Sequence, residues 1–260
     1  MAAMRRVEFG YNPPAGERGI EHINPRTFVR DLQQVLKPFM LRRLPDACPD
    51  MPEISFELVP MRAGRLPTDL AFQNFPELVE LLEAVIAGAD AFDLDAQLQM
   101  QLATVRRLTG LLKIEATCRL IEEELRMRTV EKVVVFAYHV DVCEQIARRL
   151  RVYGAGLIHG GVSAKDRWQA IDDFQERDSR VLVGEILAAS VNTTLTASHH
   201  VVFAETDWVP DNNLQAAYRC RRIGQKYPVQ VRILAISGSI DELLQQAAAR
   251  KLRQSSAIYH

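Results

Sequence analysis

Two patterns of hydrophobic and polar positions divide the 260-residue chain near residue 130. Beyond this point, short apolar runs rich in β-branched residues alternate with segments whose apolar residues recur at helical spacing. Runs that are apolar throughout are typical of parallel strands, because crossover helices cover both faces of such a sheet. We therefore expect an α/β fold over residues 131–254, with an open parallel sheet of five or six strands and helices on both faces. The expected strands are Val133–Tyr138, Gly156–Ile158, Arg180–Val183, Val201–Ala204 and Val229–Ile236.

Several helices between these strands begin with a capping-box spacing, in which two side chains three residues apart satisfy backbone donors of the first turn. After Ser239, apolar residues at i, i+3, i+4 and i+7 from Ile240 predict a helix with one apolar stripe on the sheet. Trp168 shares a predicted helix with Ile171, and we expect its ring in the core. The capping pairs are Asp141 with Glu144, Ser163 with Asp166, and Ser239 with Glu242.

The N-terminal half is predicted to be a mainly helical extension without a sheet of its own. Residues 1–24 are rich in turn-forming residues, and we expect them to be poorly ordered. The extension covers residues 25–130, and residues 255–260 form a tail after the α/β domain. The expected elements are helices over Pro25–Met40, Pro76–Ala87 and about 95–127, the last broken at Gly110, and one strand over Ile54–Met61.

The charge balance excludes two classes of protein. The chain has 32 Lys and Arg against 33 Asp and Glu, so its net charge is −1. It is therefore neither a histone-like polycation nor an acidic tail protein. A local basic patch for nucleic acid is compatible with this balance, because a whole-chain charge averages over all faces.

The four cysteines indicate a reducing compartment and no resident metal. They form no CxxC pair, so neither a zinc ribbon nor a thioredoxin-type site is expected. Four cysteines in 260 residues are also too sparse for a disulfide framework, which favours a reducing compartment. His199 and His200 are adjacent, and on a strand they would point to opposite faces and could not chelate one ion. No secretory signal and no bilayer-spanning apolar stretch are visible. We expect a soluble intracellular protein, in the cytoplasm and nucleoid or in the nucleus, without a membrane partner.

Common nucleotide and catalytic motifs are absent from the sequence. It contains no GxxxxGK[ST] phosphate loop and no acidic pair at a strand end that could hold Mg²⁺. It also contains no HExxH and no GxSxG. The chain alone is therefore expected neither to bind ATP tightly nor to hydrolyse it.

The segment Val201–Gln225 carries the most informative polar residues. A strand is followed by a helix cap at Asp211 and a predicted helix on which Gln215, Arg219 and Arg222 lie at i, i+4 and i+7 and share one face. Open α/β sheets bind ligands beyond the carboxyl ends of their strands, and the planar fork of Arg pairs with phosphate oxygens. The spacing alone leaves two interpretations, an anion site or a solvated, salt-bridged helix face.

The same segment resembles a known family. The residues QAAYRCRRIGQ at 215–225, preceded by DWVP at 207–210, are similar to the last helicase motif of the Swi/Snf-type superfamily-two ATPases. Upstream segments resemble further motifs of this family in the expected order, and the resemblance extends over about residues 25–252. Its subtype is that of the annealing-helicase or fork-remodelling branch. The upstream segments are 36–43, 111–113, 132–139, 158–167 and 184–197.

The resemblance implies the second, C-terminal RecA-like lobe of an ATP-dependent double-stranded-DNA translocase or helicase of DNA repair and replication fork remodelling. In such motors ATP lies between two lobes, and the second lobe supplies arginine fingers. Carried over by position, Arg222 is the implied finger, Arg219 its neighbour and Gln215 a polar aid, while Gly224 and Gln225 are implied nucleotide contacts. The residues implied to contact the DNA backbone, without sequence specificity, are Gly160, Gly161, Ser163, Thr194, Thr196 and Trp208.

The sequence departs from the family pattern in two ways. Ser190 and Asn192 replace glycines of the family loop, Thr193 replaces an aliphatic residue, and Arg221 replaces a histidine. The first lobe, with its phosphate loop and Mg²⁺ ligands, has no counterpart in the sequence. ATP and Mg²⁺ are therefore expected only when a first lobe completes the site. The chain is half of a split motor, a fragment of a longer enzyme, or a non-catalytic DNA- or protein-binding module that keeps a helicase fold.

Overall fold

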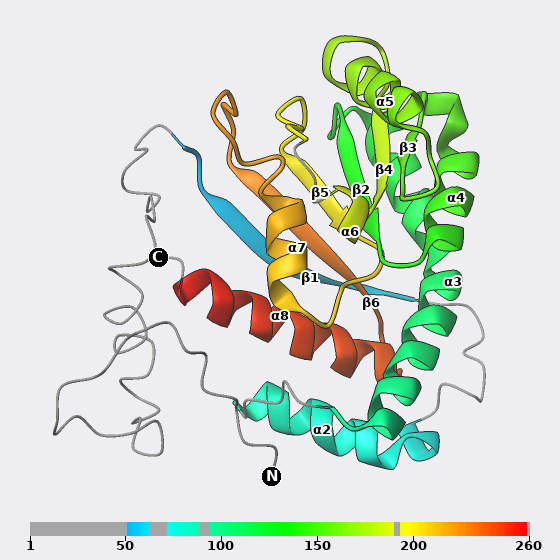
Figure 1. Cartoon of the computed structure of the whole chain (residues 1–260), viewed down its shortest axis with the longest axis vertical. Helices are drawn as coiled ribbons and strands as arrows, with labels where there is room; N and C mark the ends of the chain where they lie inside the picture. The colour runs from blue at the N-terminus through cyan, green and yellow to red at the C-terminus, as the bar shows by residue number, and fades with distance from the viewer. Residues whose placement is uncertain (1–50, 63–71, 89–93, 190–192, 259–260) are drawn as a thin grey trace, which may run out of the picture. The chain divides into compact units, whose positions relative to one another are not determined.

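The fold is built on one parallel sheet of six strands in the order β1-β6-β5-β2-β4-β3 (Figure 1). The computed structural model describes residues 51–62, 72–88, 94–189 and 193–258, so the predictions for residues 1–24 and Pro25–Met40 lie outside the described residues. All paired strands run parallel, which confirms the predicted α/β class. The strands are β1 (Ile54–Met61), β2 (Val133–Ala137), β3 (Gly156–Ile158), β4 (Val181–Glu185), β5 (His200–Phe203) and β6 (Val229–Ile236).

Strand β1 comes from the part of the sequence that we expected to be a helical extension. It pairs with β6 along all 8 of its residues, from Ile54 beside Val229 to Met61 beside Ile236. The strand was predicted but its place in the sheet was not, because alternation shows a half-buried strand and does not identify its partner. The boundary of the α/β domain near residue 130 stays a prediction.

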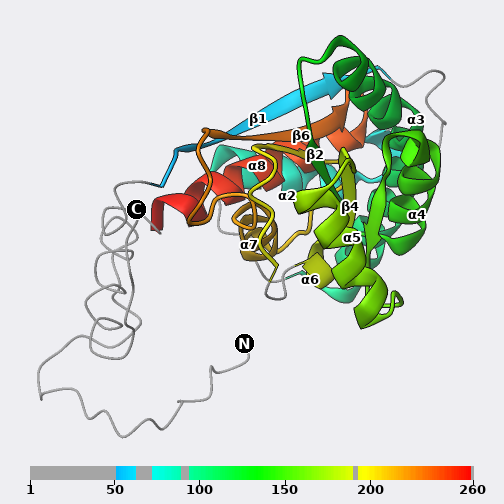
Figure 2. The same cartoon turned by 90° about the horizontal axis from the view of Figure 1, so that it is seen from above.

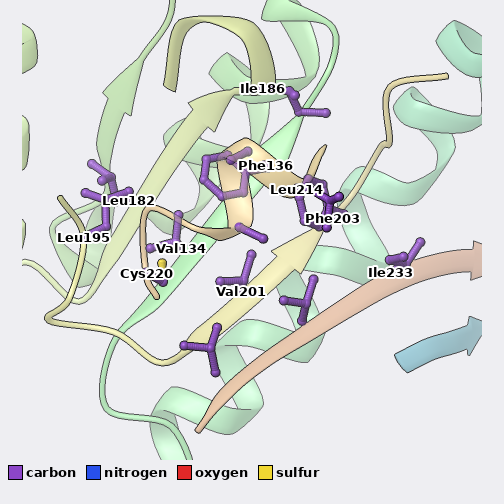
Figure 3. Packing of buried hydrophobic residues seen from close by; sticks show 14 of the residues in the cluster. Val134, Phe136, Leu182, Ile186, Leu195, Val201, Phe203, Leu214, Cys220 and Ile233 are labelled. Carbon is purple, nitrogen blue, oxygen red and sulfur yellow. The ribbon is translucent and has the colours of Figure 1, made fainter. Parts of the chain in front are cut away.

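Helices cover both faces of the sheet (Figure 2). Helices α3 and α4 bury their apolar residues against one face, and α5, α6, α7 and α8 contribute to the cluster on the other face, part of which Figure 3 shows. A third cluster joins α2 to the first half of α3 and the start of α8. No helix within the described ranges is long and apolar enough to cross a membrane. The helices are α2 (Pro76–Ala87), α3 (Ala96–Met127), α4 (Val140–Arg149), α5 (Ala164–Glu176), α6 (Ile186–Ala189), α7 (Pro210–Ala217) and α8 (Ile240–Ile258), with short 3-10 helices at Phe72–Asn74 and Leu150–Tyr153.

The capping signals were predictive at α5 but not at α4. Ser163 caps α5, where its Oγ accepts the Asp166 N–H at 3.2 Å. Asp141 does not cap α4, because that helix already begins at Val140. Its carboxylate instead bonds to Arg107 of α3 at 2.9 Å, a contact between two helices that local spacing does not reveal.

Helix α3 runs through Gly110 without the predicted break. The glycine is needed because α3 passes very close to Glu205, at the end of β5. A Cβ at position 110 would overlap the Glu205 carboxylate and lie 3.1 Å from its Cγ. Gly110 is therefore a point of close approach between helix and sheet. A glycine within a helical pattern can either break the helix or allow such close packing, and the sequence alone does not distinguish these two roles.

Gly110→Ala is expected to destabilise the chain by about 2 kcal/mol, since overpacking at this contact exceeds the roughly 1 kcal/mol gained from the helix propensity of alanine. Urea unfolding followed by circular dichroism measures the change. Ala103→Gly, at an exposed position of the same helix, is the control that changes propensity alone. Equal or greater stability of Gly110→Ala would show that the Glu205 carboxylate can move away.

Candidate functional site

The helix after β5 ends before the two predicted arginines. Helix α7 stops at Ala217, and residues 218–224 form turns and bends. The Arg219 N–H bonds to the carbonyl three residues earlier, as in a tightened last turn. The prediction that Gln215, Arg219 and Arg222 share one helix face is therefore wrong. Gln215 is exposed on the last turn of α7, and the arginines follow on the turn that leads to β6.

The start of α7 is also held differently from the prediction. Asp211 does not cap the helix, whose N-cap position is Val209 and has no side-chain cap bond. The turn is instead closed by Asp207, whose Oδ1 accepts the Val209 N–H at 3.1 Å. Asn213 reinforces it, because its amide both accepts from Asp207 N–H and donates to Asp207 O, each at 2.8 Å.

Arg222 and Arg219 form the strongest candidate for an anion site. The half-buried Arg222 donates through Nη1 to Thr194 Oγ1 at 3.2 Å, and it forms no ion pair with a carboxylate of the described residues. Arg219 is buried, at 8% exposed. Burial lowers the pKa of the Arg219 guanidinium from its ordinary value, and the positive charge of Arg222 lowers it further. Two like charges held together in this way favour an anion between them.

The loop before β5 and the turn before β6 are tied together at this site. Arg219 O accepts the Leu195 N–H at 2.8 Å. Gln225 is 6% exposed, and its amide nitrogen donates to the carbonyls of Thr196, Ser198 and Cys220 at 2.8–3.2 Å. The predicted nucleotide contact of Gln225 stays a prediction, and it would compete with these bonds. Gly224 is exposed at a φ of 103°, a backbone conformation that favours glycine.

The glycine loop predicted to contact DNA lies at the opposite end of the strands. It follows β3, and the Gly160 N–H donates to Glu185 Oε2 at the carboxyl end of β4, at 3.1 Å. The Gly161 N–H donates to His159 Nδ1 at 3.1 Å, and Ser163 caps α5. Both glycine amides therefore have partners within the chain. Thr194 and Thr196, in contrast, precede β5 and lie with Arg222 and Gln225 at the amino ends of the parallel strands.

The two tryptophans have environments that the sequence did not predict. Trp208, an implied DNA contact, packs against the cluster of α2, α3 and α8, with Lys251 Nζ 3.7 Å from its ring centroid. Trp168, expected in the core, is 65% exposed, so that prediction is wrong. The buried stripe of α5 runs through Ile171 and Phe174, and Trp168 lies beside this stripe.

A buried polar network at the carboxyl ends of β2 and β5 was missed by the sequence analysis. Glu205 is 2% exposed and accepts the N–H groups of Tyr138 and His139 at 3.1 and 2.9 Å, with His139 Nδ1 also 2.7 Å from its Oε1. Arg106 of α3 donates to Thr206 O at 2.8 Å and stacks on the Tyr138 ring, 3.6 Å from its centroid. The network connects α3 to the sheet. The only feature of the sequence that pointed to it was the carboxylate of Glu205 shortly after the β5 strand.

The two adjacent histidines do not point apart as predicted. Their ring centroids are 4.0 Å apart, because His199 precedes β5 and is not bound by strand alternation. Burial lowers the pKa of His200 to about 4 and also lowers the pKa of His199, so both rings are neutral at pH 7. Among the described residues, no group of His, Cys, Asp and Glu side chains could hold a metal ion.

Comparisons with known proteins identify a domain family that matches part of this chain. Residues 112–224 match the helicase conserved C-terminal domain family. The human DNA annealing helicase and endonuclease ZRANB3 is 30% identical over 255 residues, which cover 94% of this chain and 22% of that protein. The chain thus spans about a fifth of the length of this relative.

Solved structures share the fold. The C-terminal part of the Fun30 ATPase domain aligns with a TM-score of 0.57 and 15% identity, over 76% of this chain and 90% of that one. The Sulfolobus solfataricus SWI2/SNF2 ATPase core in complex with dsDNA aligns with a TM-score of 0.53 and 24% identity, over 84% of this chain and 49% of that one. Residues 112–224 therefore belong to the helicase conserved C-terminal domain family, and the chain is a homologue of Swi/Snf-type ATPases with the fold of their C-terminal, RecA-like lobe.

Proposed function

We propose that this chain is the second lobe of an ATP-dependent motor on double-stranded DNA, with Arg222 as the arginine finger and Arg219 beside it. The observation that carries the proposal is the arginine pair itself. Arg222 reaches the surface without a carboxylate partner among the described residues, and its charge adds to that of the buried Arg219. A transferring phosphoryl group, which is anionic, would supply a counter-charge for Arg222. Gln215, which is exposed on the last turn of α7, is proposed as a polar group that assists the two arginines.

The described residues fit one part of the ATP site and not the rest. Guanidinium forks suit phosphate oxygens, so Arg219 and Arg222 would contact the nucleotide, and Gly224 lies next to them. The Mg²⁺ ion is not accounted for, because no suitable group of carboxylates occurs in the described part of the chain. We therefore assign the phosphate loop and the Mg²⁺ ligands to a first lobe, in another polypeptide or in a longer parent chain.

DNA is the proposed second partner, bound through its backbone. Gly160, Gly161 and Ser163 form the exposed loop at the start of α5, where helix amides favour an anion. For the two glycines this contact would replace the bonds to Glu185 and His159. Three residues outside this loop are also proposed to contact the DNA backbone: Thr194 and Thr196, which precede β5, and Trp208, which follows it. Binding of this kind is independent of sequence and weakens steeply with salt.

The proposal is tested by mixing this chain with a separately produced first lobe of a Swi/Snf-type ATPase and measuring ATP hydrolysis with and without double-stranded DNA. We expect hydrolysis only in the mixture, and stimulation by DNA. The controls are each lobe alone and the mixture without DNA. DNA binding by this chain, with no hydrolysis in a mixture where the lobes associate, would instead identify a non-catalytic module.

A further inference from the structure

Arg221 lies between the two arginines of the proposed phosphate site, at the position where the family pattern has a histidine. It belongs to residues 218–224, which we call the arginine turn. Its side chain is buried, at 8% exposed. A buried guanidinium needs polar partners inside the protein, because leaving its donors unpaired is costly.

Two contacts hold this side chain. Its Nε donates to Pro52 O at 2.7 Å, and its guanidinium lies 5.8 Å from the centroid of the Tyr218 ring. A hydrogen bond from a charged donor is stronger than one between neutral groups, whereas the ring is near the limit of the cation–π range. The carbonyl of Pro52 is therefore the main anchor of Arg221. This bond joins residues 169 positions apart in the sequence, so no local pattern could reveal it.

The acceptor of this bond has a fixed position in the sheet. Pro52 lies two residues before β1, and the next carbonyl, Glu53 O, accepts the Val229 N–H at the start of β6 at 2.8 Å. Strand β1 then pairs with β6 along its whole length at the edge of the sheet (Figure 1). The Arg221 bond therefore ties the arginine turn to the edge of the sheet.

Further bonds hold the residues on either side of Arg221. Arg219 O accepts the Leu195 N–H at 2.8 Å, which ties the turn to the loop before β5, and Arg222 O accepts the Gln225 N–H at 2.9 Å. A displacement of Arg221 would therefore strain both neighbouring arginines. Misplacing a positioning group by about 1 Å can reduce a reaction rate about 10²-fold, so the anchoring of this turn matters for any chemistry at the site.

We propose that Arg221 is a positioning residue. By bonding to Pro52 O, it fixes the arginine turn to the segment before β1 and holds Arg219 and Arg222 in the arrangement that receives phosphate. The replacement of the family's histidine by arginine thus makes the segment before β1 a part of the site. This inference rests on the proposed function, in which Arg219 and Arg222 contact the nucleotide.

Two neutral substitutions separate this hydrogen bond from the charge of Arg221. The Nε2 atom of glutamine is as many bonds from Cα as the Nε atom of arginine, so Arg221→Gln keeps a donor for Pro52 O. Methionine has a similar shape and no donor. We expect Arg221→Met to accelerate hydrogen exchange of the Leu195 and Gln225 amides roughly tenfold or more, as loss of one buried hydrogen bond implies. Arg221→Gln should exchange like the unsubstituted chain. NMR of this chain without ligand measures both.

Inorganic triphosphate measures the effect on the site itself. It is titrated into each variant while the side-chain NMR signals of Arg219 and Arg222 are recorded. Arg221→Met should bind triphosphate about tenfold more weakly than Arg221→Gln, although both variants lack the charge, because only the second keeps the turn anchored. Urea unfolding of both variants checks that they are folded.

The outcomes separate this proposal from the proposed function. Exchange in Arg221→Met at the unsubstituted rate, or accelerated exchange in Arg221→Gln, would overturn the positioning role, and the second result decides even if Arg221→Met does not fold. Equal triphosphate binding by the two variants would also overturn it and leave the phosphate role of the arginines standing. If exchange changes as expected while triphosphate shifts neither Arg219 nor Arg222 in the unsubstituted chain, the phosphate role fails and the anchoring of the turn stands.

Discussion

Arg222→Ala is expected to reduce DNA-stimulated ATP hydrolysis of the assembled two-lobe motor by about 10³-fold or more, the range measured for removal of arginine fingers. The fold should be unaffected, because Arg222 is only half-buried and its one side-chain hydrogen bond within the described residues is to Thr194. Hydrolysis is measured with both lobes at saturating DNA, and urea unfolding of the variant checks stability. Arg222→Lys should recover little, since an ammonium cannot replace the planar fork.

The matched control is Arg126→Ala, which removes an exposed arginine from the last turn of α3. It changes the net charge by the same amount and should leave hydrolysis within about twofold of the unsubstituted motor, as expected for a surface position. Near-normal turnover in Arg222→Ala would contradict the role proposed for this residue. A large loss in both variants would point to net charge rather than to the position of the guanidinium.

Asp241→Ala is expected to destabilise the chain by about 3–5 kcal/mol, because it leaves a buried charge without its partner. Lys113 of α3 and Asp241 of α8 have fully buried side chains, and Lys113 Nζ lies 3.0 Å from Asp241 Oδ1. The carboxylate also accepts the Ile236 N–H at 2.8 Å and a bond from Gln245 at 3.1 Å. Denaturant unfolding measures the loss.

Two controls accompany the Asp241→Ala prediction: a substitution in an exposed ion pair, and a double substitution that replaces the buried pair. Asp141→Ala breaks the surface pair with Arg107 and should cost less than about 1 kcal/mol. Replacing Lys113 with Met and Asp241 with Leu together should recover much of the loss, since buried pairs can be exchanged for apolar residues of similar volume. If Asp241→Ala were no more destabilising than Asp141→Ala, the buried pair would not be holding α3 to α8.

Most elements could be predicted from local sequence signals. The expected bounds of Val229–Ile236 and Pro76–Ala87 match β6 and α2, because β-branched runs and a proline at a helix start act over a few residues. The pairing of β1 with β6 and the contact of Gly110 with Glu205 were not predictable in this way. Each of these two contacts joins segments that are far apart in the sequence. The local pattern of each segment is compatible with several partners, so it does not identify the right one.

The candidate site shows the same limit. The motif pointed to Arg219 and Arg222, and both lie on the turn between α7 and β6, but not on one helix face as the spacing predicted. The helix ends at Ala217, and the arginines are positioned by a turn whose shape depends on Gln225 and on the loop before β5. Trp168 was placed in the core because it shares a helix with Ile171, but the buried stripe of that helix runs through Ile171 and Phe174 and leaves Trp168 beside it.

The central claim is that Arg219 and Arg222 together receive the phosphates of a nucleotide. It is tested most directly by recording the Nε–Hε NMR signals of the arginine side chains while this chain is titrated with inorganic triphosphate. We predict that the signals of Arg219 and Arg222 shift together and saturably, and that Arg222→Ala removes the response of Arg219. Shifts confined to other arginines, or an Arg219 response that persists in Arg222→Ala, would contradict the claim.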